Sequence, residues 1–96
     1  LGVMPRDGTA ADLKWFDIPA CYVFHPLNAF DDGDDVVLDV ARYEKMWVKG
    51  FDAPAHLHRF RLDLKSGVAK GETLDVHPIE FPRVRDEVAG MPYRYG

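Results

Sequence analysis

The clearest pattern in the chain is an alternation of apolar and charged residues across positions 57–64. A period of two is typical of a β-strand with one buried face, because successive side chains point to opposite sides of a sheet. The residues expected on the buried face are Phe60, Leu62 and Leu64, and those expected on the polar face are Arg59, Arg61 and Asp63. Residues 57–64 are therefore predicted to form a half-buried strand.

Shorter runs rich in β-branched and aromatic residues predict further strands on either side. They lie at 13–18, 21–24, 36–43, 68–74 and 79–82, with residues 44–54 as an excursion between strands. An acidic turn at 31–35 joins two of these runs into a hairpin. Turn signals recur about every ten residues and no helical period is sustained, as expected of an all-β meander, barrel or propeller. We therefore predict an all-β fold.

Composition narrows the functional classes. The chain has 96 residues and a formal net charge of −4, and its basic residues are scattered singly. Without a basic stripe to neutralise phosphates, no nucleic acid is expected as a partner. The single cysteine, Cys21, cannot form an internal disulfide, and no apolar run approaches the roughly 20 residues of a membrane span. These features predict a cytoplasmic protein.

Four histidines are the candidate metal-binding residues, namely His25, His56, His58 and His77. No second cysteine or closely spaced acid completes a zinc spacing near any of them. His56 and His58 would share one face of a strand, which a metal could use, although two solvent-facing histidines at a strand edge is the favoured interpretation. His25 follows an apolar run, where a buried imidazole needs partners for both nitrogens. From the residues alone, a core histidine bonded to backbone carbonyls is favoured over a metal ligand.

Residues 21–30 resemble a motif of one known family. They read Cys-Tyr-Val-Phe-His-Pro-Leu-Asn-Ala-Phe, which is similar to the Phe-His-x-x-Asn-Ala-aromatic segment of the carotenoid oxygenases, the family of carotenoid cleavage and lignostilbene dioxygenases. Further matches occur in the family's order at 4–8, 36–39, 61–64, 80–83 and 92–96. The resemblance covers nearly the whole chain. A start without Met and an aromatic end predict a domain that is truncated at both ends.

The resemblance implies a seven-bladed β-propeller, of which this chain would supply about two blades. In that family, four axial histidines hold Fe(II). By match to the motif, His25 is one iron ligand, and Glu80 is a glutamate that hydrogen-bonds a ligand histidine and fixes its orientation. A surface carboxylate beside a strand end stays open as the alternative for Glu80. The remaining histidines match no ligand motif, so the other three ligands would lie outside this chain.

The activity that the resemblance implies is oxidative cleavage of a conjugated double bond in a carotenoid, apocarotenoid or stilbene. Fe(II) would be the cofactor, and O2 and an elongated apolar molecule would be the substrates. The fragment would be inactive alone. Some family members also dock on membranes through an apolar patch, which cannot be located in this sequence. The alternative from a different class is a non-catalytic all-β binding module.

The implied iron site sets expectations for three side chains. His25 should be substantially buried at a strand end. Glu80 should lie about 2.7–3.0 Å from a ring nitrogen if its partner is present, the range of charge-assisted hydrogen bonds. His58 should face water or a neighbouring loop.

Overall fold

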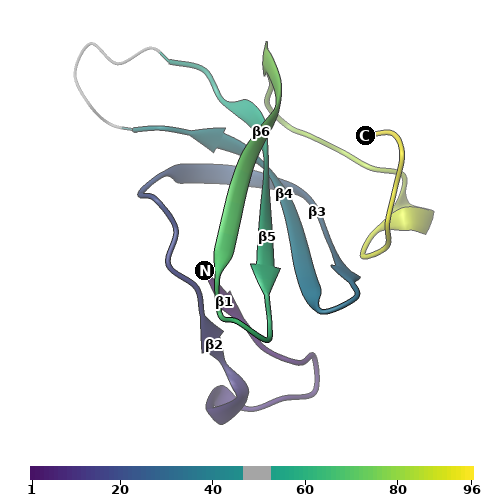
Figure 1. The fold of residues 1–96 in the computed structure, drawn as a ribbon. Coiled ribbons are helices and arrows are strands. Elements are labelled where there is room, and N and C mark those ends of the chain that lie inside the picture. The colour runs from purple at the N-terminus through teal and green to yellow at the C-terminus, as the bar shows by residue number, and fades with distance from the viewer. Residues whose placement is uncertain (47–52) are drawn as a thin grey trace.

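A four-stranded antiparallel sheet forms the body of the protein, which a computed structural model describes for residues 1–46 and 53–96 (Figure 1). Its strands, in the order β3-β4-β5-β6, are β3 (Tyr22–Asp32), β4 (Asp35–Tyr43), β5 (His56–Asp63) and β6 (Ala69–Pro78). A two-stranded sheet pairs β1 (Gly2–Val3) with β2 (Lys14–Trp15). Helical structure in the described residues is limited to two single 3₁₀ turns, η1 (Ala10–Asp12) and η2 (Asp86–Val88). The all-β prediction is therefore confirmed.

One face of the sheet packs against the N-terminal segment. Phe60, Leu62 and Val40 form a buried cluster with Phe16, which directly follows β2. The backbone of Phe16 is tied to the start of the chain, because its amide donates to the carbonyl of Leu1 at 2.7 Å and its carbonyl accepts from the Leu1 amino group at 2.9 Å. Each large apolar side chain buried here contributes about 1.5–3 kcal/mol. The N-terminal segment thus covers the apolar face that the alternation in β5 predicts.

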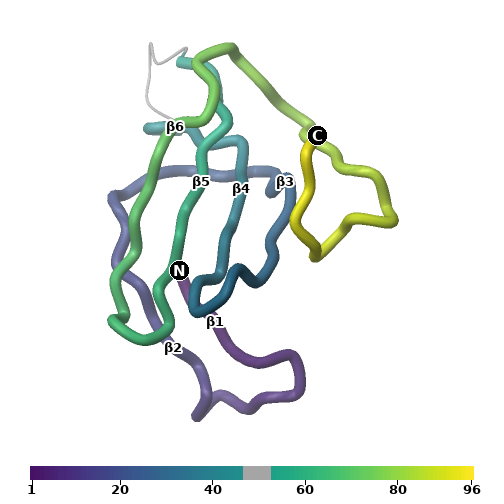
Figure 2. The backbone as a smooth tube through the Cα atoms, turned by 45° about the vertical axis from the view of Figure 1, so that its right-hand side comes forward, coloured from purple at the N-terminus to yellow at the C-terminus, as the bar shows by residue number. Residues whose placement is uncertain are grey.

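The opposite face of the sheet contacts the C-terminal segment, residues 83–96, which Figure 2 shows beside β3. Asn28 of β3 anchors this segment, and its side chain is only 8% exposed. Its amide nitrogen donates to the carbonyls of Val88 and Met91, and its oxygen accepts from the amide of Gly90. The two ends of the chain therefore lie on opposite faces of one sheet.

The strands predicted at 36–43, 57–64 and 68–74 correspond to β4, β5 and β6, and β6 extends four residues further than predicted. The hairpin across the acidic turn 31–35 is confirmed, as are the strands at 57–64 and 68–74. The run at 13–18 is a strand only over Lys14–Trp15. The run at 21–24 is the start of an 11-residue strand. Residues 47–52 of the predicted excursion lie outside the described residues.

The predicted strand at 79–82 is wrong. The sheet ends with β6 at Pro78. The amide of Ile79 still donates to the carbonyl of Ala55 at 3.0 Å, but residues 79–82 form no strand in the described chain. Phe81 has a left-handed backbone, with φ 52°, which breaks an extended strand. Pro82 then has no amide hydrogen for a ladder. Among the described residues, no helix is long or apolar enough to cross a bilayer.

Candidate functional site

His25 lies in a β-bulge near the start of β3. The pairing of β3 with β4 is regular up to Val23, shifts register before Pro26 and shifts again before Asn28. Bulges interrupt the ladder and redirect side chains, and Pro26 fits at one because it has no amide hydrogen to donate. The expected position at a strand end is therefore wrong, since β3 continues to Asp32. The bulge, and not a strand terminus, sets the direction of the His25 ring.

A carboxylate from much later in the chain contacts this histidine. Nδ1 of His25 lies 2.7 Å from Oε2 of Glu80, and the two residues are 55 positions apart. This distance is typical of a charge-assisted hydrogen bond. The side chain of Glu80 is 24% exposed and that of His25 is 42% exposed. The expectation of a substantially buried His25 is therefore wrong, because in this chain the ring stays partly open to solvent.

The contact with Glu80 fixes the tautomer of the His25 ring. Partial burial acts to raise the pKa of Glu80, but the hydrogen bonds that its carboxylate accepts outweigh burial and hold the pKa below its usual value. Glu80 is then an ionised acceptor at neutral pH, so Nδ1 carries the proton of the neutral imidazole. The lone pair is left on Nε2, which has no hydrogen-bond partner among the described residues. The ring thus presents a nitrogen donor in the form that binds metals.

The second oxygen of Glu80 is a buried acceptor with no partner. Oε1 has no hydrogen-bond partner among the described residues. The phenol of Tyr43 interacts with the carboxylate, and this interaction, followed by burial, raises the pKa of Tyr43 above its usual value. Unpaired buried acceptors are uncommon in folded proteins and are found at strained or functional sites.

Two aromatic side chains, Phe81 and Phe24, lie beside the His25 ring. The ring centroid of Phe81 lies 4.6 Å from that of His25, with 36° between the planes. Phe24 makes edge contacts with Tyr22 at 4.7 Å and with Tyr43 at 5.7 Å. Such pairs are favourable by about 0.5–1.5 kcal/mol beyond their buried area. Phe24 is 42% exposed and Phe81 is 76% exposed, so His25 stands within an aromatic surface.

The backbone at Phe81 is strained. It is the one described non-glycine residue with positive φ, at 52°. A left-handed conformation costs a residue with a β-carbon about 1–2 kcal/mol. The following Pro82 adds to this, because a residue before proline favours the extended region. The amide of Phe81 donates to Oε2 of Glu80 at 2.8 Å, so the strained turn holds the oxygen that His25 contacts.

Comparison with known protein families shows which family this chain resembles. Residues 1–96 match the model of the family described as retinal pigment epithelial membrane protein. The chain belongs to this family. Its relatives include enzymes named carotenoid cleavage oxygenases, so the resemblance seen in the sequence is confirmed.

The relatives within the family are oxygenases by name. The chain is 39% identical to a carotenoid cleavage oxygenase from Mycobacterium tuberculosis, over 99% of this chain and 21% of that protein. It is 31% identical to an isoeugenol monooxygenase from Pseudomonas putida, over 99% of this chain and 22% of that protein. The chain therefore spans about a fifth of the length of the family members that it matches.

A solved structure shares the fold of this family member. The cobalt-substituted apocarotenoid oxygenase from Synechocystis superposes with a TM-score of 0.85 at 28% identity. The match covers 97% of this chain and 21% of that chain. The predicted fold, an all-β segment of a β-propeller, is confirmed by this match.

Two of the other histidines, His58 and His77, contact residues other than Glu80. The ring of His58 packs 4.6 Å from that of Phe60, and its Nδ1 lies 3.3 Å from the hydroxyl of Thr73. Burial, followed by the charge of Arg42, lowers the pKa of His58. The ring is therefore half-buried against its own sheet, and its contact with Thr73 lies at an exposed position, so the expectation that it faces water holds in part. No group of three or more metal-binding side chains occurs in residues 1–46 and 53–96.

Sequence reasoning missed a buried ion pair on the face opposite the apolar cluster. Asp39 of β4 is fully buried, and Arg59 of β5 contacts both of its oxygens at 2.8 Å. The hydroxyl of Tyr93 donates to Oδ2 at 2.6 Å. Hydrogen bonding to Asp39 raises the pKa of Arg59, and burial followed by the same carboxylate raises that of Tyr93. The signal was an acid inside the apolar run 36–41, opposite an arginine of the alternating strand.

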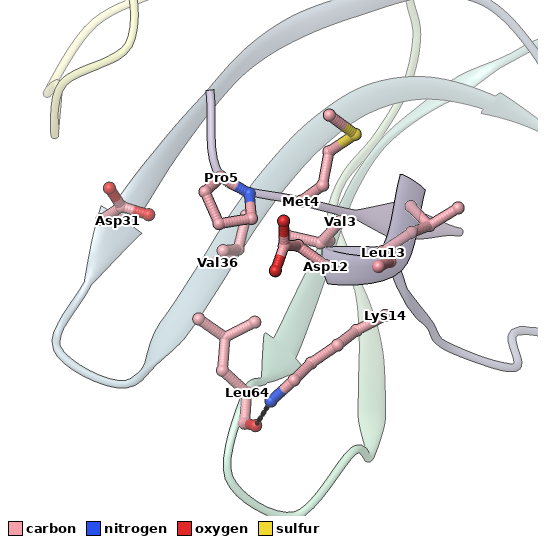
Figure 3. A pocket seen from close by; sticks show the side chains of 10 residues that line it. Val3, Met4, Pro5, Asp12, Leu13, Lys14, Asp31, Val36 and Leu64 are labelled. Atoms are coloured by element: carbon pink, nitrogen blue, oxygen red, sulfur yellow. Dashed lines mark hydrogen bonds between the residues drawn. The ribbon is translucent and has the colours of Figure 1, made fainter. Parts of the chain in front are cut away.

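A separate pocket of about 530 Å³ lies between the N-terminal segment and the β3–β4 hairpin (Figure 3). Apolar side chains such as Met4 and Leu64 line it, and two of its polar side chains, Asp12 and Lys14, have partners within the chain. Asp12 caps η1 through Thr9, and Nζ of Lys14 donates to the carbonyl of Leu64 at 2.8 Å. Its lining is mainly apolar and contains no histidine or cysteine, so the candidate metal-binding site is the one at His25.

Proposed function

We propose that this chain is part of an Fe(II)-dependent oxygenase in which His25 supplies one iron ligand through Nε2. The observation that carries the proposal is the 2.7 Å contact between Nδ1 and Glu80, which directs the unprotonated nitrogen away from the carboxylate. A metal-binding histidine ordinarily donates its other ring nitrogen to a carboxylate or carbonyl in this way. The names of the relatives support an oxygenase over the non-catalytic binding module.

The residues present fit one position of such a metal site. A neutral imidazole suits Fe(II), and Glu80 adds a negative charge behind the ring that strengthens the nitrogen as a donor. When bound, Fe(II) would supply the redox chemistry with which O2 cleaves a conjugated double bond. His25 is the one histidine of this chain that matches the family's ligand motif, so the other ligands would come from parts of the protein outside this chain.

The proposed substrate is an elongated, apolar, conjugated molecule of the carotenoid, apocarotenoid or stilbene type. The aromatic surface around His25 supports this, because the exposed rings of Phe24 and Phe81 can pack against a flat conjugated chain. The relatives carry names that refer to carotenoids, an apocarotenoid and isoeugenol. All of these compounds contain conjugated carbon–carbon double bonds.

The test compares two histidine variants of the full-length protein. His25→Ala should reduce bound iron below about a tenth of the wild-type content. It should lower turnover of an apocarotenoid or stilbene by more than the roughly 100-fold upper range of outer-shell substitutions. His58→Ala is the matched control, since this imidazole lies in the same sheet but bonds to Thr73. It should keep both iron and turnover.

Iron content is measured by metal analysis, turnover by loss of substrate absorbance, and folding by circular dichroism. A folded His25→Ala variant that keeps full iron and full turnover would show that the ligand assignment is wrong. Equal loss in both variants would show that general damage to the sheet, rather than ligation, explains the effect.

A further inference from the structure

Two contacts of Phe81 converge on the pair formed by His25 and Glu80. The Phe81 ring lies 4.6 Å from the imidazole, and its amide donates to Oε2 of Glu80 at 2.8 Å. That oxygen is the one that His25 contacts at 2.7 Å. Phe81 therefore touches both members of the pair, the ring of one and the carboxylate of the other.

The conformation of Phe81 has no local reason outside this site. Its φ of 52° is unfavourable for a residue with a β-carbon, and its side chain is 76% exposed, so burial of the ring does not compensate the strain. Glycine would adopt the same backbone without strain, but it would lack the ring. Strained residues persist where the surroundings over-determine them, and they cluster at functional sites.

We propose that Phe81 is a positioning residue that clamps the imidazole of His25 in its ligating orientation, which rests on the proposed function of His25. The amide of Phe81 donates to Oε2 of Glu80 and fixes that oxygen, and the left-handed φ of Phe81 sets the direction in which its ring leaves the backbone. The aromatic ring restricts rotation of the imidazole from its face, while Oε2 holds it at Nδ1. The amide of Phe81 thus acts on His25 through Glu80, and the ring of Phe81 contacts the imidazole directly.

The experiment measures release of Fe(II) from the full-length protein to an excess of chelator, followed by absorbance. Phe81→Ala should raise the release rate about 10-fold, the lower range for groups that orient a ligand. This variant loses the ring, and its β-carbon favours relaxation out of the left-handed region. Phe81→Gly keeps the backbone and should raise the rate less, by about 3-fold, and Phe81→Tyr keeps both features and should stay within about 2-fold of wild type.

Tyr95→Ala is the exposure-matched control, because Tyr95 is also 76% exposed and its ring faces the guanidinium of Arg94. It should release iron at the wild-type rate. The Co(II)-loaded forms give a second readout, since a misaligned imidazole should shift the visible absorption of Phe81→Ala and leave that of Phe81→Tyr unchanged. The high exposure of Phe81 predicts that all of these variants fold, which circular dichroism checks.

The outcomes separate this inference from the proposed function. If His25→Ala loses its iron while Phe81→Ala releases iron at the wild-type rate with an unchanged Co(II) spectrum, Phe81 has no positioning role and the ligand assignment stands. If His25→Ala retains its iron, the ligand assignment fails and the positioning role fails with it. The order Tyr, Gly, Ala in rising release rate supports the clamp.

Discussion

At the scale of single residues, the site depends on the different hydrogen bonding of the two oxygens of Glu80. Oε2 of Glu80 accepts from both His25 and the amide of Phe81, whereas Oε1 is buried without a partner. The ionised form of Glu80 is favoured despite partial burial, because the hydrogen bonds made to it outweigh desolvation. The charge is therefore held directly behind the His25 ring, where it fixes the tautomer.

Replacing Glu80 with Gln tests this charge directly. The change should lower the pKa of Tyr43 toward its usual value of about 10, because a neutral amide no longer opposes ionisation of the phenol. The pKa of Tyr93 should not change, since its shift comes from burial and from Asp39. Titration of carbon-labelled tyrosines by nuclear magnetic resonance in the metal-free, full-length protein measures both values. An unchanged pKa for Tyr43 would show that Glu80 is not its ionised neighbour.

The sequence predicts the identities of the two site residues but not their surroundings. His25 and Glu80 come from motif resemblance, because no local periodicity joins positions 55 residues apart. The left-handed backbone at Phe81 could not be predicted, since the residue type opposes it. The run 79–82 instead favoured a strand on composition. The local sequence preference fails at the residue where the structure shows strain, which is the usual place for such failures.

At the scale of elements, the bulge in β3 and the ion pair between β4 and β5 shape the sheet. The bulge lets an 11-residue strand carry both His25, within the irregular pairing, and Asn28, which anchors the C-terminal segment. The carboxylate of Asp39 links β4 to β5 through Arg59 and to the C-terminal segment through Tyr93. The turn that carries Glu80 and Phe81 is thus followed by a segment that is hydrogen-bonded to the sheet.

Replacing Arg59 with Met should destabilise the protein by about 3–5 kcal/mol, because it leaves the charge of Asp39 buried with only the hydroxyl of Tyr93 as a partner. Arg61→Met is the matched control on the same strand. Its partners Asp32 and Asp35 are 52% and 31% exposed, so the loss should stay below about 1 kcal/mol. Chemical denaturation of the full-length variants gives both values. Equal losses in the free energy of unfolding would show that the buried ion pair contributes no more to stability than the exposed one.

The strands are predicted correctly where side-chain alternation is strong. The prediction fails where a β-bulge or a left-handed residue sets the course of the backbone. β5 follows from the alternation at 57–64, and β4 from its apolar run. The predicted end of the strand at 24 was wrong because proline ordinarily interrupts a ladder, whereas here Pro26 occupies a register shift. The pairing of Asp39 with Arg59 depends on strand register, which a single sequence does not specify.

At the scale of the whole molecule, one sheet is enclosed by the two ends of its own chain. The N-terminal segment lies on the Phe60 face and the C-terminal segment on the Asp39 face (Figures 1 and 2). The four-stranded sheet and its neighbours superpose on about a fifth of the Synechocystis oxygenase. This arrangement places the bulge with His25 and the turn with Glu80 on one aromatic surface. The proposed chemistry needs further ligands, so it belongs to the full-length protein.

The most direct test of the central claim is an anomalous-scattering map from crystals of the full-length protein loaded with Co(II). The account predicts a metal peak about 2.1 Å from Nε2 of His25, the usual metal–imidazole distance, with Nδ1 still bonded to Glu80. A metal peak that lies outside bonding distance of His25, with its ring still directed at Glu80, would contradict the account.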